Sequence, residues 1–240
     1  MLLRLPTSLP EVHACMAQGA VPIGGATLAW ATWQRDGFPE QSMSLRNLPE
    51  ANTLAPGELG AAVLLSEIDD RVPEVLHRAA ASIGTGAVRR TATVGGNLVG
   101  STLRCLLPAA LVLDARAVTV ESGATYETDL AEVIAKQHLL LRLMWHTPTA
   151  SCFYKQPTGP GGPPPVVVAA AVHTVAHGRG VLRVAVRDGY DVVSEHTAHT
   201  ADAGEALRAL RQTEIGTLQE AAWTAVRREV TDLLDRVGRS

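Results

Sequence analysis

The chain of 240 residues is long enough for one large domain or for two to three small domains packed together. Its 21 basic and 24 acidic residues give a net charge of -3, which excludes the basic field needed for non-specific binding to nucleic acid or to anionic membranes. A hydrophobic fraction of 46% beside 19% charged residues excludes a disordered or collagen-like chain.

Residues 1–56 have the pattern of a β-α-β unit. A strand is predicted at residues 2–5, and the helix after it begins near Ser8. Ser8 and Glu11 are typical of a capping box, in which the serine hydroxyl accepts a hydrogen bond from the first turn of the helix.

A pair of glycines, Gly24 and Gly25, directly follows a second short strand predicted at residues 21–23. A helix is expected from residue 27 to residue 33. Backbone N–H groups can converge on an anion where a strand, glycines and the start of a helix follow one another.

Residues 57–147 are expected to form a second part of the same domain, with helical and strand periodicities that alternate. The predicted elements are a strand at 58–63, a helix at 72–83, a second glycine cluster at 93–97, a helix at 108–115 and a strand at 117–121.

A third part is predicted from residue 148 to residue 240. After a cluster of glycine and proline at 157–165, two strands at 166–176 and 181–186 are expected to form a hairpin. Two closing helices are predicted at 203–210 and 218–237.

The three cysteines, Cys15, Cys105 and Cys152, are far apart in the sequence. They are too few for an all-cysteine iron–sulfur cluster or a four-cysteine zinc site, and an odd number cannot form a complete disulfide framework. We therefore expect a cytoplasmic protein without a metal site of its own. The longest uncharged apolar run, residues 166–172, is too short to cross a membrane.

Two glycine pairs about seventy residues apart, at 24–25 and 95–96, are the strongest candidates for a binding site. A chain without a basic patch can hold a diphosphate only with oriented backbone N–H donors, and glycine allows the backbone to come close to a phosphate. The alternative is that each pair forms only a tight turn.

Both glycine pairs lie in motifs that resemble those of a known family. Residues 22–28, Pro-Ile-Gly-Gly-Ala-Thr-Leu, resemble A-G-G-T-[DS]-L, the first flavin-binding loop in the FAD-binding medium subunits of molybdenum hydroxylases of the xanthine dehydrogenase and carbon monoxide dehydrogenase type. Residues 88–98, Val-Arg-Arg-Thr-Ala-Thr-Val-Gly-Gly-Asn-Leu, are similar to the second loop, (I/V)-R-N-x-x-T-[IL]-G-G-N-[IL]. Residues 59–61 and 108–115 fit the family's L-G-A and P-A-L-L-A-L-x-A segments, so the resemblance extends over residues 1–145.

This resemblance implies a two-part FAD-binding domain of the vanillyl-alcohol-oxidase/PCMH type at 1–56 and 57–147, followed by a small, shortened α+β domain at 148–240. It implies FAD as the cofactor, with both loops wrapped around its pyrophosphate. The cofactor-binding residues that it implies are Ile23, Gly24, Gly25, Ala26, Thr27, Leu28, Thr93, Gly95, Gly96, Asn97, Ser101, Thr102 and Lys155.

The sequence also departs from the family pattern. Ala26 stands where the family usually has threonine, which removes one hydroxyl donor. The family normally has a proline and then an aspartate after the second loop, and the aspartate helps to hold the ribityl side of the flavin; residues 99–107 contain neither. Ser101 and Thr102 could donate hydrogen bonds in its place. Lys155 could reach the flavin ring or merely begin a strand.

Two classes of function remain open at this stage. The first is an FAD-dependent oxidoreductase, either an electron-transfer subunit with iron–sulfur and molybdenum partner subunits or a stand-alone oxidase or dehydrogenase acting on a small organic substrate. The alternative is a non-redox enzyme or ligand-binding protein, for example in a biosynthetic pathway, that keeps the FAD-domain scaffold. The sequence identifies no catalytic residue and leaves the substrate, the electron acceptor and a homo-oligomeric state open.

Overall fold

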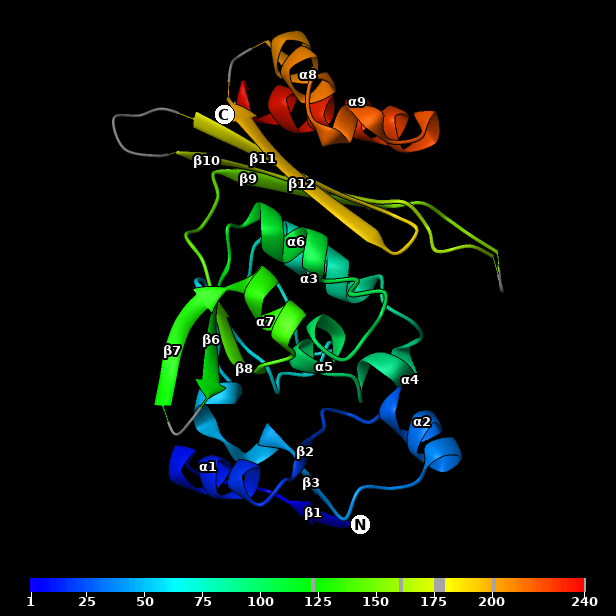
Figure 1. Cartoon of the computed structure of the whole chain (residues 1–240). Coiled ribbons are helices and arrows are strands. Elements are labelled where there is room, and N and C mark those ends of the chain that lie inside the picture. Colours follow the sequence, from blue (N-terminus) through cyan, green and yellow to red (C-terminus); the bar gives the residue numbers. More distant parts are fainter. Residues whose placement is uncertain (122–123, 160–161, 175–179, 200–201, 240) are drawn as a thin grey trace. The chain divides into compact units, whose positions relative to one another are not determined.

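The computed structural model describes residues 1–121, 124–159, 162–174, 180–199 and 202–239 (Figure 1). Contacts within the chain divide it into two compact units. Unit 1 consists of Met1–Val72, Ile83–Cys105 and Ala115–Trp145, and unit 2 of Pro73–Ser82, Leu106–Asp114 and His146–Ser240. The sequence-based division at residues 56 and 147 stays a prediction.

The N-terminal part of unit 1 is a small parallel sheet in the order β1-β3-β2. Its elements are β1 (Leu2–Arg4), α1 (Leu9–Ala17), β2 (Val21–Pro22), α2 (Ala29–Asp36) and β3 (Gln41–Met43). Val12 and Cys15 of α1 are buried in a cluster with Met43 of β3, so the apolar face of α1 holds it on the sheet.

The start of α1 differs from the predicted capping box. The Ser8 hydroxyl makes no capping hydrogen bond, and the prediction for this side chain is wrong. The Glu11 carboxylate instead accepts a hydrogen bond of 2.8 Å from the backbone N–H of Thr7. Glu11 therefore binds the N–H of Thr7, whereas a capping box at Ser8 predicts a bond to the N–H of Ser8 itself.

The larger sheet of unit 1 is antiparallel, with the strand order β4-β5-β8-β6-β7. Its strands are β4 (Leu54–Ala55), β5 (Glu58–Gly60), β6 (Arg116–Glu121), β7 (Ala124–Asp129) and β8 (Leu139–Met144). The short helices of this part are η1 (Leu45–Asn47), η2 (Pro49–Ala51), α4 (Gly86–Arg89), α5 (Val94–Leu98) and α7 (Leu130–Lys136). The strand predicted at 58–63 thus ends at residue 60, and the chain turns away to meet α5.

Unit 2 is built on an antiparallel sheet in the order β12-β11-β10-β9. Its strands are β9 (Ala150–Lys155), β10 (Val167–Thr174), β11 (Gly180–Asp188) and β12 (Asp191–Ala198). The predicted pairing of the two strands now called β10 and β11 is confirmed, with Val167 opposite Arg187. Most of the turn predicted between them, residues 177–179, lies outside the described residues.

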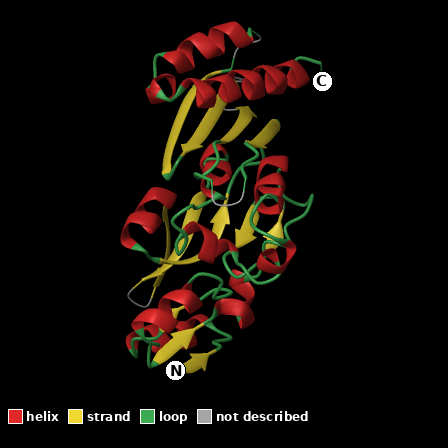
Figure 2. Ribbon diagram, turned by 90° about the vertical axis from the view of Figure 1, so that its right-hand side faces the viewer, coloured by secondary structure: helices red, strands yellow, loops and turns green. Residues whose placement is uncertain are grey.

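Helices cover both faces of this sheet (Figures 1 and 2). The helices α8 (Ala203–Arg211) and α9 (Glu220–Val237), with η4 (Glu214–Thr217), lie on one face, and α3 (Glu74–Ala81) and α6 (Leu107–Val112) on the other. Side chains of β10 are consequently buried on both faces, which explains its continuous apolar sequence. Within the described residues, no helix has the length and apolarity needed to span a bilayer.

Candidate functional site

The two glycine pairs are brought together in unit 1. A Cβ atom added at Gly24 would lie 2.2 Å from the Thr93 hydroxyl oxygen, and one added at Gly25 would lie 1.6 Å from the carbonyl oxygen of Thr91. Any side chain at these two positions would overlap the second loop. The structure therefore gives these glycines a role in packing loop against loop.

The second loop is the start of the short helix α5. The Thr93 hydroxyl caps this helix and accepts a hydrogen bond of 3.2 Å from the N–H of Gly96. The N–H of Gly95 donates to the carbonyl of Ala61 at 2.8 Å, and that of Val94 donates to Val63 at 3.1 Å. The N–H groups of this loop are thus used to fix it to the segment that follows β5.

The first loop differs from the second in its hydrogen bonding. The N–H of Ile23 donates to the carbonyl of Met43 at 2.8 Å and continues the pairing of β2 with β3. Within the described structure, the N–H groups of residues 24–28 have no protein acceptor. Ala26 has a φ of 57°, a left-handed conformation that turns the backbone sharply in the middle of this run.

The donor set of the first loop suits a negatively charged group. Five successive N–H groups lead into α2, and the first turn of α2 carries no acidic side chain. Thr27 and Leu28 are exposed, so a ligand can approach the loop from solvent. These residues fit the pyrophosphate of a dinucleotide, because oriented backbone amides can bind its charge without a basic patch.

The other predicted site residues fall into two groups. Asn97 is buried in α5, beside the capped turn, and Ser101 and Thr102 follow this helix. The Ser101 hydroxyl oxygen accepts a hydrogen bond of 3.3 Å from the N–H of Leu103, while Thr102 is exposed. Lys155 belongs to unit 2, where its ammonium donates to the carbonyl of Ser82 at 2.6 Å.

Sequence reasoning missed residues that support the second loop from outside it. Ala61 and Val63 accept two of its N–H groups, and Ala61 also packs on Gly95, whose added Cβ would lie 3.1 Å from the Ala61 side chain. The L-G-A motif at residues 59–61 is the signal that could have identified this support. The family resemblance marks the motif, but only the folded chain shows what it touches.

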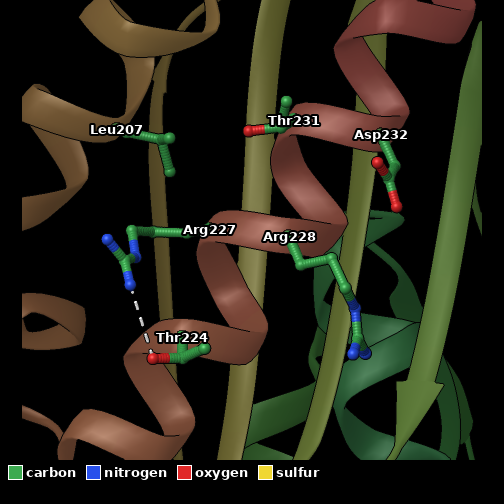
Figure 3. Close-up of a pocket in the computed structure, with 6 residues that line it drawn as sticks. All are labelled: Leu207, Thr224, Arg227, Arg228, Thr231 and Asp232. Atoms are coloured by element: carbon green, nitrogen blue, oxygen red, sulfur yellow. Dashed lines mark hydrogen bonds between the residues drawn. The ribbon is translucent and has the colours of Figure 1, made fainter.

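Two hollows on unit 2 contain none of the predicted site residues. One, of about 460 Å³, is open and lies along α9, where Arg227 donates to the Thr224 hydroxyl at 3.5 Å (Figure 3). Its other arginine, Arg228, lies over the ring of Tyr154 and pairs with Glu229. The second, of about 430 Å³, contains the ion pair of Glu74 and Arg236. Their arginines are thus already engaged within the protein.

The family described as the FAD binding domain in molybdopterin dehydrogenase matches residues 3–140 of the chain. This range contains both glycine loops and nearly the whole β-α-β unit. No curated protein matches the chain.

Solved structures with the same fold align over nearly the whole chain. Quinoline 2-oxidoreductase from Pseudomonas putida 86 is 18% identical with a TM-score of 0.69, and the match covers 98% of this chain and 96% of that one. The Cu,Mo-CO dehydrogenase in its cyanide-inactivated form is 15% identical with a TM-score of 0.76, and reconstituted CO dehydrogenase from Oligotropha carboxidovorans is 15% identical with a TM-score of 0.75. Each of these two matches covers 98% of both chains. The fold is thus α+β, with the FAD-binding part of the PCMH type followed by the α+β C-terminal part.

Proposed function

The chain belongs to the family of FAD-binding domains of molybdopterin dehydrogenases and is a flavoprotein with FAD as its cofactor, and on this premise we propose that it is an electron-transfer subunit of a larger dehydrogenase. The observation that supports the cofactor site in this proposal is the first loop, in which the N–H groups of residues 24–28 have no acceptor among the described residues. No acceptor among the described protein atoms binds these N–H groups. They are available for the pyrophosphate of FAD.

Each loop has its own task in the proposed site. The N–H groups of residues 24–28 would hold the pyrophosphate, and the left-handed residue Ala26 lies in the middle of this run. The capped turn of Thr93 and Gly96 holds the second loop rigid against Gly24. Asn97, Ser101, Thr102 and Lys155 stay predicted contacts of the cofactor. FAD, when bound, supplies the chemistry of accepting and releasing electrons, which the protein positions and tunes.

The cysteines support a role that depends on a partner for electrons. Cys15, Cys105 and Cys152 are all buried and none is paired in a disulfide, and the described residues contain no group of side chains that could hold a metal ion. The chain itself therefore offers no iron–sulfur or molybdenum site in its described part. We propose that partner subunits carry such centres, and that the complex works in the reducing cytoplasm, where free thiols persist.

The cofactor assignment is tested with protein purified without added flavin. We expect a yellow protein with flavin absorbance that releases FAD on denaturation. Colourless protein that also fails to take up added FAD would refute the assignment. Substrate oxidation by the isolated chain, without any partner, would refute the proposed role as a subunit while leaving the cofactor in place.

A further inference from the structure

Arg104 has a backbone conformation that L-amino acids adopt rarely. Its φ is 40°, and the described chain contains three other non-glycine residues with positive φ, namely Ala26, Asp114 and Gln137. Asp114 and Gln137 follow the helices α6 and α7, where left-handed residues are common. Ala26 lies in the first loop of the cofactor site. Arg104 ends no helix, so its conformation requires another reason, and strained backbone is concentrated at functional sites.

Among the described residues, the Nε atom of Arg104 also has no hydrogen-bond partner. Its side chain is half-buried, its Nε is shielded from solvent, and within the described residues this atom has no hydrogen-bond acceptor. Arg89, another half-buried arginine of unit 1, donates to the carbonyl of Ile83 at 2.9 Å. A guanidinium stays charged at all ordinary pH values, so a shielded donor without an acceptor is unfavourable.

The segment that carries Arg104 follows directly on the last turn of α5. The N–H of Val99 donates to the carbonyl of Gly95 at 2.9 Å, and a Cβ added at Gly100 would lie 3.1 Å from the carbonyl of Gly96. Gly96 is in turn bound by the Thr93 hydroxyl. The segment that carries Arg104 thus begins where the helix of the second loop ends.

The distance from this contact to Arg104 is short. Four residues separate Gly100 from Arg104, so their Cα atoms are at most about 14 Å apart. The hydrogen bond from the Leu103 N–H to the Ser101 hydroxyl turns the chain and shortens that distance. Arg104 therefore lies in the segment that directly follows the second loop, seven residues after Asn97.

We propose that Arg104 binds FAD directly, with its guanidinium donating to an oxygen of the cofactor. The proposal rests on FAD as the cofactor and deepens the proposed function. An arginine needs an oxygen acceptor, and FAD offers two kinds: a charged oxygen of the pyrophosphate and a carbonyl oxygen of the isoalloxazine ring. Either one satisfies the shielded donor and explains why the backbone is held in a strained conformation.

The test compares Arg104→Met with Arg46→Met, since Arg46 is an exposed arginine of the same unit. In titrations of apoprotein with FAD, we expect Arg104→Met to raise Kd by about 10- to 100-fold, the usual effect of losing a charge-assisted hydrogen bond, and Arg46→Met to leave it unchanged. Arg104→Lys retains the charge and is expected to recover part of the affinity.

Two further measurements separate the kinds of oxygen. If Arg104 contacts the pyrophosphate, its loss weakens the binding of ADP as well as of FAD. If it contacts the isoalloxazine carbonyl, ADP affinity is unchanged and the midpoint potential of the bound flavin becomes more negative, because a positive charge that favours the reduced ring is lost.

Wild-type protein provides a measurement that does not depend on the folding of a variant. Butanedione modifies accessible arginines, and bound FAD should protect Arg104 but not Arg46 from it, as read by mass spectrometry. Equal modification of Arg104 with and without FAD, or wild-type values of Kd and potential in Arg104→Met, would overturn the proposal. Failure of the wild-type chain to bind FAD at all would instead refute the cofactor assignment.

Discussion

Substitution of Gly25 by alanine tests whether the glycines of the first loop serve packing or only the approach to phosphate. An added Cβ would lie 1.6 Å from the carbonyl oxygen of Thr91 and 2.3 Å from its carbonyl carbon. Real Cβ atoms essentially never come closer than 3.0 Å to another atom, so the two loops must separate by about 1.4 Å. Both sides of this contact are backbone, and neither can move away by a simple change of rotamer.

The cost of Gly25→Ala follows from this overlap. Overpacking in a close-packed region costs about 1–3 kcal/mol, and in a protein of this size each kcal/mol lowers Tm by roughly 2–4 °C. We therefore expect Tm to fall by roughly 2–12 °C already in the apoprotein. FAD affinity should fall as well, because the N–H groups of residues 24–28 lose their fixed position against the second loop.

Gly86→Ala is the matched control in the same unit. A Cβ at Gly86 would meet no atom closer than 3.5 Å, and alanine is the better helix former by about 1 kcal/mol. Differential scanning fluorimetry of both variants, with and without FAD, separates the two explanations. If Gly25→Ala leaves the Tm of the apoprotein equal to that of wild type and lowers only FAD affinity, the packing argument is wrong and the glycine serves the phosphate alone.

Two other predictions concern a helix cap and a buried thiol. Thr93→Val removes the hydroxyl that accepts a hydrogen bond from the N–H of Gly96, so the free energy of unfolding measured in urea should fall by about 1 kcal/mol. Thr93→Ser keeps a hydroxyl and should keep most of the stability. A valine variant as stable as wild type would contradict the capping role of Thr93. Burial raises the pKa of the Cys152 thiol to about 12, so the folded state disfavours the thiolate more than the unfolded state does. The resulting stability is fully present below the unfolded pKa, near 8.5, and is lost as the pH rises towards 12. A thiol reagent at pH 8 should accordingly leave Cys152 unmodified until the protein unfolds, and rapid labelling of the native protein would refute its burial.

Elements with a strong local pattern were predictable from the sequence. The helix α9 has apolar residues at helical spacing, and the sequence between β10 and β11 contains the turn-forming residue glycine, so the types of these elements follow from neighbouring residues alone. Their packing was not predictable. The helices α3 and α6 come from the middle of the chain and join unit 2, because the apolar faces of β9 and β10 bind segments remote in sequence.

The candidate site, too, was predictable from the sequence only in part. The motifs identified both glycine loops, but α5 includes Gly95 and Gly96, and glycine disfavours a helix by about 1 kcal/mol per residue. Contacts with Ala61 and the cap from Thr93 override this preference. Which loop keeps free N–H groups depends on acceptors more than thirty residues away, so a local pattern could not distinguish the two loops.

Lys155 is the residue at which the sequence and the structure lead to different expectations. The family resemblance predicts a contact with the flavin, while in unit 2 the Lys155 ammonium donates to the carbonyl of Ser82, the residue that ends α3. A cation at the C-terminus of a helix is favourable, typically by about 0.3–1 kcal/mol. We expect Lys155→Met to lower the Tm of the apoprotein by roughly 1–4 °C and Lys155→Arg to restore it. FAD titrations of the same variants measure the other role: an unchanged Kd in Lys155→Met restricts this lysine to capping α3, whereas a weakened Kd with an unchanged apoprotein Tm would refute the capping role.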